Sequence, residues 1–194
     1  MPFASSEAAQ AFHDVCIIGS GPAGLATAIS LHGRGLRVLL LDAGGRHPVP
    51  GSPDVIAAQI EHPNAHWPTE LTAAAALGGS SHWWGGRLVQ FDKADFLTWP
   101  IAYQEMQRWQ TNAAQLLGAV GTRLGPPPES FSRLSHFHAD DPERWLRRRN
   151  VGKLWDSYLR AKNGPVALLN ARVTGLNMAA DRIDSVDFVC NGAT

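Results

Sequence analysis

The amino-acid sequence predicts an α/β fold, with a parallel sheet flanked by helices and a small antiparallel β-meander near the end of the chain. Two observations predict this fold. An apolar run at Asp14–Ile18 is followed by a glycine-rich turn, a helical segment at 22–34 and a second apolar run at 37–42, which is the order of a βαβ unit. From Pro165 onward, apolar and polar residues alternate with the period of strands. We expect Asp14–Ile18 to be the central strand of the parallel sheet, with 37–42 beside it.

The turn after the first apolar run has the pattern G-x-G-x-x-G, formed by Gly19, Gly21 and Gly24. In this pattern the first glycine allows a sharp turn, the second leaves room for a pyrophosphate beside the backbone, and the third lets the helix pack closely on the sheet. The N–H groups at the start of the helix face the phosphates, and the missing N–H of Pro22 costs nothing in the first turn. The glycine turn, 19–24, therefore predicts a Rossmann-like dinucleotide-binding domain.

The second apolar run closes on Asp42. This position, about 20 residues beyond the turn, is where an acid accepts the protons of both ribose hydroxyls of a bound dinucleotide. An acid also disfavours a 2′-phosphate, so NADP is the least expected dinucleotide. The alternative is a glycine cluster that packs a helix on a strand without any ligand.

Charge and composition exclude several classes of partner. The 17 Lys and Arg residues balance the 17 Asp and Glu residues, and 44% of the chain is hydrophobic. Nothing in this balance favours nucleic acid or an anionic membrane surface, and no apolar run is long enough to span a membrane. Cys16 and Cys190 lie far apart, which predicts neither a disulfide framework nor a metal site. A cytoplasmic location is the default expectation.

Histidines gather in two places, at His47, His62 and His66 and at His136 and His138. The first group has no acid or cysteine that completes a compact set of metal ligands, and the two histidines of the second group are too few by themselves. We therefore expect these histidines to lie in loops or at the surface, and we predict no metal site.

A second glycine motif, Leu77–Leu88, reads LGGSSHWWGGRL. Its glycine pairs allow close backbone approach or positive φ, and its serine hydroxyls and N–H groups suit phosphate oxygens or the polar edge of a heterocycle. The alternative is a surface loop whose tryptophans are anchored in the core. After a dinucleotide-binding turn, the ligand-binding interpretation is favoured.

The remaining pattern places further elements along the chain. Residues 1–12 form a polar leader that we expect to be disordered, and 13–194 form the predicted domain. Amphipathic helices are predicted at Tyr103–Leu117, ended by Gly118, and at Pro142–Arg160. Three strands are predicted to form the antiparallel meander: Val166–Leu169, Ala171–Met178 and Ile183–Val189.

With these motifs in place, the chain resembles the N-terminal part of the glucose–methanol–choline family of FAD-dependent oxidoreductases. The resemblance rests on DVCIIGSGPAGLATAISLHGRGLRVLLLDAGG, LGGSSHWWGG, DF followed by WPIAY before a helix ending in LLG, and NARVTGL. The order and rough spacing of the four match, and they span almost the whole chain. The subtype is similar to the sugar- and polyol-oxidising branch, in which a Thr or Ser and a Trp often lie between two glycine pairs.

The resemblance implies FAD as the cofactor and oxidation of a CH–OH group of a sugar, polyol or other alcohol by hydride transfer to flavin N5. Asp42 would hold the adenosine ribose, and Val173 would present its backbone to the adenine. Trp84 and Gly85 would lie at the isoalloxazine edge. The implied contacts to the pyrophosphate and its surroundings are Gly19, Gly21, Pro22, Ala23, Gly24, Ala43, Gly79 and Ser80.

Some members of this family attach FAD covalently through a histidine in the second glycine motif. Aligned on Gly78 and Gly79, that position here is Trp83, and His82 is one residue early. Non-covalent FAD is therefore expected.

Family members continue with a strand that completes the FAD site, a substrate domain and a C-terminal segment. That segment carries a catalytic His paired with His or Asn, which accepts the alcohol proton as general base. No histidine here matches that position, so we predict no catalytic residue. The domain is expected to be partial and incomplete at its C-terminal end, and this chain alone is expected to be inactive. The sequence does not identify the electron acceptor.

Two other interpretations remain open. An NAD-dependent Rossmann dehydrogenase explains Asp14–Asp42 equally well, but it leaves LGGSSHWWGG and NARV without a role. A non-catalytic remnant, which binds nucleotide without turnover or folds poorly, is the other. Flavin absorbance of the purified protein separates FAD from NAD, and activity with an alcohol and an artificial acceptor tests the remnant.

Overall fold

The computed structural model describes residues 3–49, 60–62, 64–119 and 144–190. The chain divides into two compact units, each described here by itself. The first unit contains Met1–Trp84 and Asn150–Thr194, and the second contains Gly85–Arg149. The histidines at 136 and 138 lie outside the described residues.

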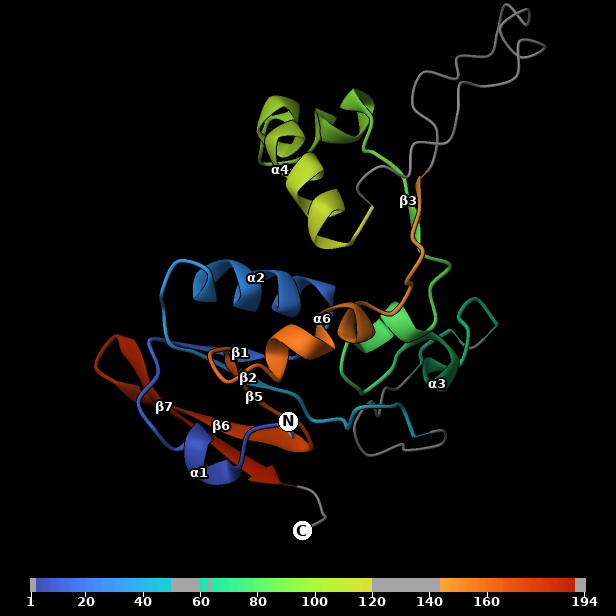
Figure 1. The fold of residues 1–194 in the computed structure, drawn as a ribbon. Coiled ribbons are helices and arrows are strands. Elements are labelled where there is room, and N and C mark those ends of the chain that lie inside the picture. Colours follow the sequence, from blue (N-terminus) through green and yellow to red (C-terminus); the bar gives the residue numbers. More distant parts are fainter. Residues whose placement is uncertain (1–2, 50–59, 63, 120–143, 191–194) are drawn as a thin grey trace, which may run out of the picture. The chain divides into compact units, whose positions relative to one another are not determined.

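The first unit is built on a three-stranded parallel sheet with the order β1-β2-β5 (Figure 1). Its strands are β1 (Val15–Ile18), β2 (Val38–Leu41) and β5 (Val166–Leu168). Every residue of β2 is buried, because this strand lies between the other two and is covered on both faces. The predicted α/β fold with a parallel sheet is confirmed.

The expected strand order is wrong. Asp14–Ile18 was expected at the centre, but β1 lies at the edge of the described sheet and β2 is central. The order differs because β5 pairs with β2, at Leu41↔Leu168, and not with β1. Ile18, at the end of the edge strand, is 55% exposed.

The predicted meander is smaller than expected. Val166–Leu169 was placed in it, whereas β5 joins the parallel sheet. Its residues form a continuous apolar run, which is typical of a parallel strand buried on both faces. The antiparallel sheet consists of β6 (Ala171–Ala179) and β7 (Arg182–Cys190), joined by the predicted turn at Ala180, which has a φ of 57°.

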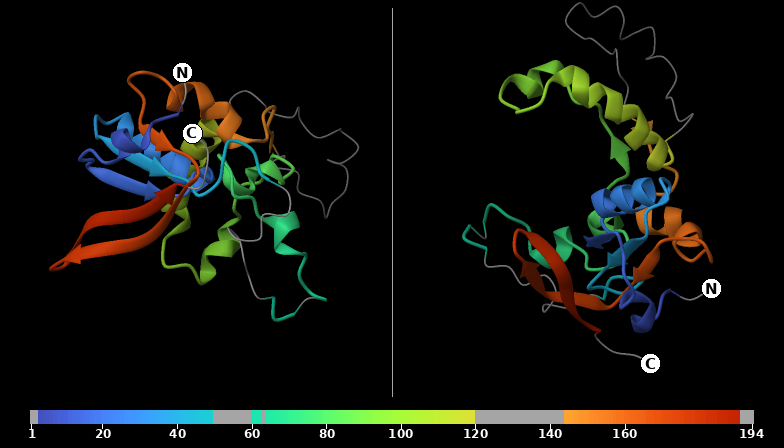
Figure 2. Two further views of the ribbon diagram at one scale, coloured as in Figure 1. Left: turned by 90° about the horizontal axis from the view of Figure 1, so that it is seen from below. Right: turned by 90° about the vertical axis from the view of Figure 1, so that its left-hand side faces the viewer.

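The sheet lies between helices on one face and the β6–β7 hairpin on the other (Figures 1 and 2). Helix α2 (Pro22–His32) buries Leu25 and Ala28 toward the sheet. On the opposite face, Leu39 and Leu41 form a hydrophobic cluster with Ala9, Leu168 and Ala171. This division follows from the alternation of side chains along a strand.

Two further helices flank this core. Helix α6 (Val151–Leu159) packs near α2, where His32 Nδ1 and the Tyr158 hydroxyl are hydrogen-bonded at 2.6 Å. Helix α1 (Ser6–Ala9) lies in the segment expected to be disordered. Its Ala9 is buried, and the N–H of Ala4 donates to the Ala167 carbonyl, which holds this segment against β5.

The second unit pairs β3 (Arg87–Leu88) with β4 (Arg144–Trp145) in antiparallel fashion. It also contains the 3-10 helix η2 (Lys93–Leu97) and helix α4 (Tyr103–Leu116). Helix α4 ends as predicted, at Gly118 with a φ of 75°. The helix predicted over 142–160 is confirmed only in its second half, α6, which begins after Asn150, whose side chain caps it. In the first half, 144–145 form β4 and 142–143 lie outside the described residues.

Short elements complete the described chain: α3 (Thr69–Thr72) and the 3-10 helix η1 (Gly79–His82). Within the described residues, no helix is long and apolar enough to cross a membrane. The same residues contain no group of three or more His, Cys, Asp or Glu side chains that could hold a metal ion.

Candidate dinucleotide site

Two of the three glycines in the glycine turn are required by the backbone, and the third borders open space. Gly19 has a φ of +95°, a backbone conformation that side chains rarely allow. A Cβ on Gly24 would lie 2.0 Å from the Gly19 carbonyl oxygen, so this glycine permits the close packing of α2 on the turn. Gly21 has a φ of −61°, and no atom lies within 4 Å of the position of its Cβ. The open space beside Gly21 is where a ligand could approach the backbone.

Helix α2 begins at this open space. Gly21 is its N-cap, no side chain caps the first turn, and no acidic residue lies in that turn. Pro22 occupies the first helical position, and Ala23 is exposed. No side chain of the first turn thus compensates the positive end of the helix dipole, which suits an anion such as a pyrophosphate.

The structure brings the second glycine motif against the glycine turn. A Cβ on Gly79 would lie 3.0 Å from Gly21 Cα, and Gly79 has a φ of +54°. Gly78, with a φ of +98°, donates its N–H to the Ser20 carbonyl at 3.0 Å. Ser80, in η1, is exposed. The backbones of 19–21 and 78–79 therefore lie in contact, although the two segments are almost 60 residues apart in the chain.

Asp42 lies at the end of β2, only 7% exposed, with its carboxylate already bonded within the chain. Its Oδ2 accepts from the N–H of Ser20 at 2.7 Å and from the Ser20 hydroxyl at 2.5 Å. Its Oδ1 accepts from the N–H of Gly44 at 2.8 Å, and Ala43 between them is half-buried. No role for Ser20 was predicted from the sequence. The feature that could have indicated one is its hydroxyl, which stands between the first two glycines of the turn.

The loop after β2 is held against the second glycine motif. A Cβ on Gly44 would lie 2.0 Å from the Ala75 carbonyl oxygen, and the N–H of Leu77 donates to the Gly45 carbonyl at 2.9 Å. The backbone of Asp42 is tied to the start of β6, because the N–H of Ala171 donates to its carbonyl. These contacts fix the carboxylate in relation to both glycine motifs.

The N-terminal end of helix α6 contacts the second glycine motif. A Cβ on Gly152 would lie 2.3 Å from the Leu77 carbonyl oxygen. The Ser81 hydroxyl donates to the Gly78 carbonyl at 2.6 Å and accepts from the N–H of Val151 at 3.1 Å. The sequence did not predict that α6 contacts the second glycine motif, because the two are 70 residues apart.

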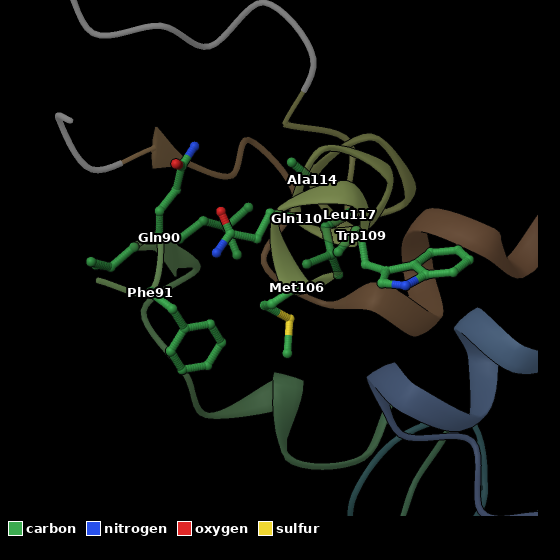
Figure 3. A pocket seen from close by; sticks show the side chains of 10 residues that line it. Gln90, Phe91, Met106, Trp109, Gln110, Ala114 and Leu117 are labelled. Carbon is green, nitrogen blue, oxygen red and sulfur yellow. The ribbon is translucent and has the colours of Figure 1, made fainter. Parts of the chain in front are cut away.

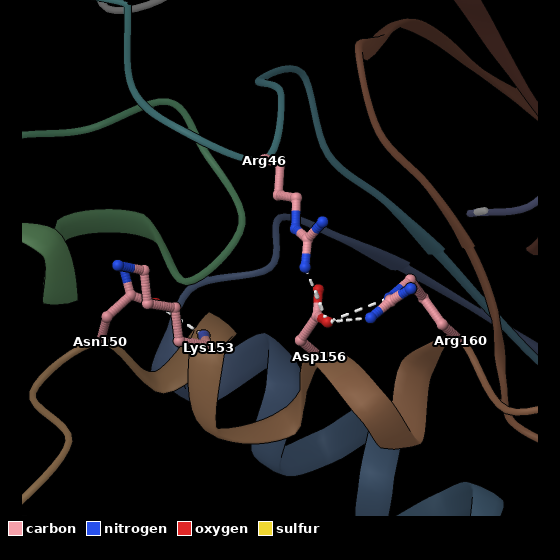
Figure 4. Close-up of polar contacts among 5 residues, drawn as sticks. All are labelled: Arg46, Asn150, Lys153, Asp156 and Arg160. Carbon is pink, nitrogen blue, oxygen red and sulfur yellow. Dashed lines mark hydrogen bonds and ion pairs between the residues drawn. The ribbon is translucent and has the colours of Figure 1, made fainter. Parts of the chain in front are cut away.

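An ion pair network anchors α6 to the loop after β2 (Figure 4). The buried carboxylate of Asp156 accepts from Arg46 Nη2 at 2.8 Å and from Arg160 Nε at 3.0 Å. A second bond from Arg160 Nη2 reaches the same oxygen. Removing either arginine would leave the buried Asp156 carboxylate poorly compensated. We therefore infer that this network holds the loop after β2 on α6.

The other predicted cofactor residues are spread more widely. Val173 lies in β6 and packs on the hydrophobic cluster. Trp84 ends the first unit and is half-buried, whereas Gly85 begins the second unit and is exposed. His82 Nε2 donates to the Leu77 carbonyl at 3.0 Å, and the indole N–H of Trp83 donates to the Ala73 carbonyl at 3.1 Å. His82 and Trp83 thus both hold the second glycine motif through backbone carbonyls.

The second unit contains an apolar pocket of about 190 Å³ (Figure 3). It lies between the segment 88–91 and one face of α4, and its residues include Phe91, Met106 and Trp109. Gln90 and Gln110 are the polar side chains in its lining. The pocket contains none of the residues predicted to bind the cofactor.

Comparisons with known proteins agree with this geometry. The family model described as FAD dependent oxidoreductase (DAO) matches residues 14–183. No curated protein sequence matches. Among solved structures, pyridoxine 4-oxidase from Mesorbium loti matches with a TM-score of 0.56 and 18% identity, over 92% of this chain and 46% of that one. L-amino acid deaminase from Proteus myxofaciens matches with a TM-score of 0.39 and 18% identity, over 92% and 42%.

The similarity to pyridoxine 4-oxidase, at 18% identity, shows the fold. This chain spans less than half the length of either protein. The family model covers most of the described residues, including both glycine motifs, Asp42 and the start of the β6–β7 hairpin. The chain therefore belongs to the FAD-dependent oxidoreductase family.

Proposed function

We propose that this chain is the FAD-binding part of an oxidoreductase of the glucose–methanol–choline type, which acts on CH–OH groups of a sugar, polyol or other alcohol. The observation that carries the FAD site is the approach of Gly79 to Gly21, with 3.0 Å between a Cβ on the first and the Cα of the second. It supports a single ligand that contacts both glycine motifs.

The described residues fit FAD. The open space beside Gly21 and the uncapped start of α2 suit a pyrophosphate. Asp42 lies at the end of the neighbouring strand, where it can accept from the adenosine ribose. The proposed contacts are Gly19, Gly21, Pro22, Ala23, Gly24, Asp42, Ala43, Gly79, Ser80, Trp84, Gly85 and Val173.

Bound FAD supplies the hydride acceptor, at flavin N5. The residues of this chain would bind and orient the cofactor: the N–H groups in the first turn of α2 would hold the phosphate oxygens, and Asp42 would accept from a ribose hydroxyl. No residue is proposed as the general base. His82 is the nearest candidate in sequence, but it lies within the second glycine motif and its Nε2 donates to the Leu77 carbonyl. We infer that this chain alone does not turn over substrate.

The substrate class rests on the four sequence motifs of the glucose–methanol–choline resemblance. The second glycine motif, with its tryptophans before a second glycine pair, supports the sugar- and polyol-oxidising branch. The fold similarity to pyridoxine 4-oxidase is compatible with this proposal. Non-covalent attachment is supported by Trp83, which takes the place of the histidine that some relatives link to FAD.

Titration with FAD and, separately, with NAD tests the cofactor. We expect quenching of flavin fluorescence on addition of the wild-type chain, and no NAD binding at comparable concentrations. Precipitation with acid is expected to release all of the flavin into the supernatant, because the attachment is non-covalent. Preferred binding of NAD would contradict the proposal, and flavin retained in the precipitate would contradict non-covalent attachment.

Anaerobic stopped-flow absorbance tests the substrate class and the lack of turnover. The FAD-loaded chain is mixed with a panel of sugars, primary alcohols and L-amino acids, and flavin bleaching is followed. We expect no bleaching with any of them. Bleaching by an alcohol or sugar would support the substrate class but show that a base within the chain was overlooked, and His82 would be the first residue to replace. Bleaching by amino acids alone would contradict the CH–OH assignment.

A further inference from the structure

The side chain of Ser20 connects three parts of the candidate site. It is fully buried, and its hydroxyl donates to Asp42 Oδ2 at 2.5 Å. The same hydroxyl oxygen accepts from the N–H of Gly78 at 3.2 Å. A continuous chain of hydrogen bonds therefore runs from the second glycine motif through Ser20 to the acid at the end of β2.

Ser20 also determines which oxygen of Asp42 keeps an acceptor site. A carboxylate has about four lone-pair sites, two on each oxygen. Oδ2 accepts both the N–H and the hydroxyl of Ser20, whereas from the described part of the chain Oδ1 accepts only the N–H of Gly44. One acceptor site remains open, and it is on Oδ1. Asp42 is therefore prepared for one ribose hydroxyl rather than for both.

We propose that Ser20 is a positioning residue, which holds the Asp42 carboxylate ready for the adenosine ribose and couples it to the second glycine motif. This inference rests on the proposed FAD site. A side chain that is ordered before binding loses less conformational entropy when the ligand arrives. In addition, hydrogen bonds to a carboxylate are stronger than those between neutral groups. Loss of the Ser20 hydroxyl leaves Oδ2 with one donor fewer, so that the carboxylate is held less firmly, by the backbone N–H groups of Ser20 and Gly44.

A double-mutant cycle tests this assignment in the full 194-residue chain. FAD affinity is measured for the wild type, Ser20→Ala, Asp42→Ala and the double variant, with thermal unfolding of each as a check on folding. Ser20→Ala is expected to weaken FAD binding about tenfold, as the loss of one hydrogen bond to a charged group does. In the Asp42→Ala background, the same substitution is expected to change affinity less than about threefold, because Ser20 acts through Asp42.

Two further variants keep the test decisive. Ser20→Cys has nearly the same volume but a weaker donor, so it is expected to lose affinity even if Ser20→Ala is poorly folded. Ser30→Ala, at an exposed serine of α2, is the matched control and should bind FAD like the wild type.

The outcomes separate this inference from the proposed function. Equal tenfold losses from Ser20→Ala in both backgrounds would show a structural role independent of Asp42 and overturn the assignment, as would wild-type affinity in both Ser20 variants. Absence of FAD binding by the wild-type chain would overturn the proposed function itself, and this assignment with it.

Discussion

At the scale of single residues, the glycine turn contains two glycines that the backbone requires and one, Gly21, that is proposed to contact the ligand. Gly19 is required by its left-handed backbone, and Gly24 is required because a side chain would meet the Gly19 carbonyl. Gly21 has neither constraint, since its φ is that of an ordinary residue and its Cβ would enter open space. The fold therefore tolerates a side chain at Gly21, and only a ligand would be displaced by it.

This difference predicts opposite behaviour of two alanine variants. Gly21→Ala should unfold at the temperature of the wild type but bind FAD at least about tenfold more weakly, a loss of about 1.4 kcal/mol. Gly24→Ala should lower the free energy of unfolding by about 1–3 kcal/mol, as overpacking does. Differential scanning fluorimetry and FAD titration measure the two effects. Unchanged FAD affinity in Gly21→Ala would remove the glycine turn from the cofactor site.

At the scale of elements, helix α6 is held to the second glycine motif by backbone contact rather than by large side chains. Gly152 lies so close to the Leu77 carbonyl that any Cβ would collide with it. Ser81 bridges the same two segments through its hydroxyl. The position of the motif beside the glycine turn depends on this contact, although α6 itself has no predicted contact with FAD.

Gly152→Ala should therefore destabilise the first unit by about 1–3 kcal/mol, despite the better helix propensity of alanine. It should also weaken FAD binding, because the second glycine motif must shift. Chemical denaturation gives the first quantity and FAD titration the second. Gly21→Ala is the matched control of the same substitution, and it should lose FAD affinity without losing stability. Equal stability of the two variants would contradict the contact between α6 and Leu77.

The starts of β1 and β2 are joined by an exposed ion pair. The carboxylate of Asp14 accepts from the backbone N–H of Arg37 and from its guanidinium, both at 2.8 Å. These hydrogen bonds to Arg37 lower the pKa of Asp14 to about 2. Because the folded-state pKa is depressed, the pair stabilises the fold above the ordinary pKa of 3.8 and this contribution is lost as the pH falls toward 2.

An NMR titration of the side-chain carboxyl groups checks this prediction. Asp14 should titrate near pH 2 in the wild type and closer to 3.8 in Arg37→Ala. Arg34→Ala, at an exposed arginine of the same connection, should leave the Asp14 midpoint unchanged. High salt should weaken the effect, since the pair is exposed. A wild-type midpoint near 3.8 would show that the pair does not persist in solution.

At the scale of the whole molecule, the described sheet forms one side of the proposed cofactor site. The three strands carry the glycine turn and Asp42, and β1 is an edge strand whose Ile18 is 55% exposed. This chain spans 46% of the length of pyridoxine 4-oxidase. The contacts proposed for the adenosine and pyrophosphate lie in the first unit, whereas few are proposed for the flavin ring.

FAD bound to this chain should therefore be weakly held and its flavin exposed to water. We expect most of the FAD to separate from the protein during gel filtration, and iodide to quench the fluorescence of the flavin that remains bound. Free FAD provides the reference for quenching. Stoichiometric FAD in the protein peak, with a flavin protected from iodide, would show that the chain covers the ring.

The features that depend on neighbouring residues in the chain could be predicted from the sequence. The apolar runs, the glycine spacing and Asp42 predicted a βαβ unit with a dinucleotide turn, and the pattern of 103–117 predicted α4 with its end at Gly118. Each depends on residues close together in the chain, whose backbone preferences and periodicity are visible in the sequence. The same pattern predicted FAD through the family resemblance.

Contacts between segments distant in the chain could not be predicted from the sequence and are seen in the folded structure. A run such as Val166–Leu169 is apolar whether it pairs in a meander or in a parallel sheet, and its pairing with β2 made β1 an edge strand. The roles of Ser20 and Gly152 likewise depend on distant partners: Asp42 lies 22 residues from Ser20, and Leu77 lies 75 residues from Gly152. A single small residue carries no periodic signal, so its function becomes visible only when the fold places a carboxylate or a carbonyl beside it.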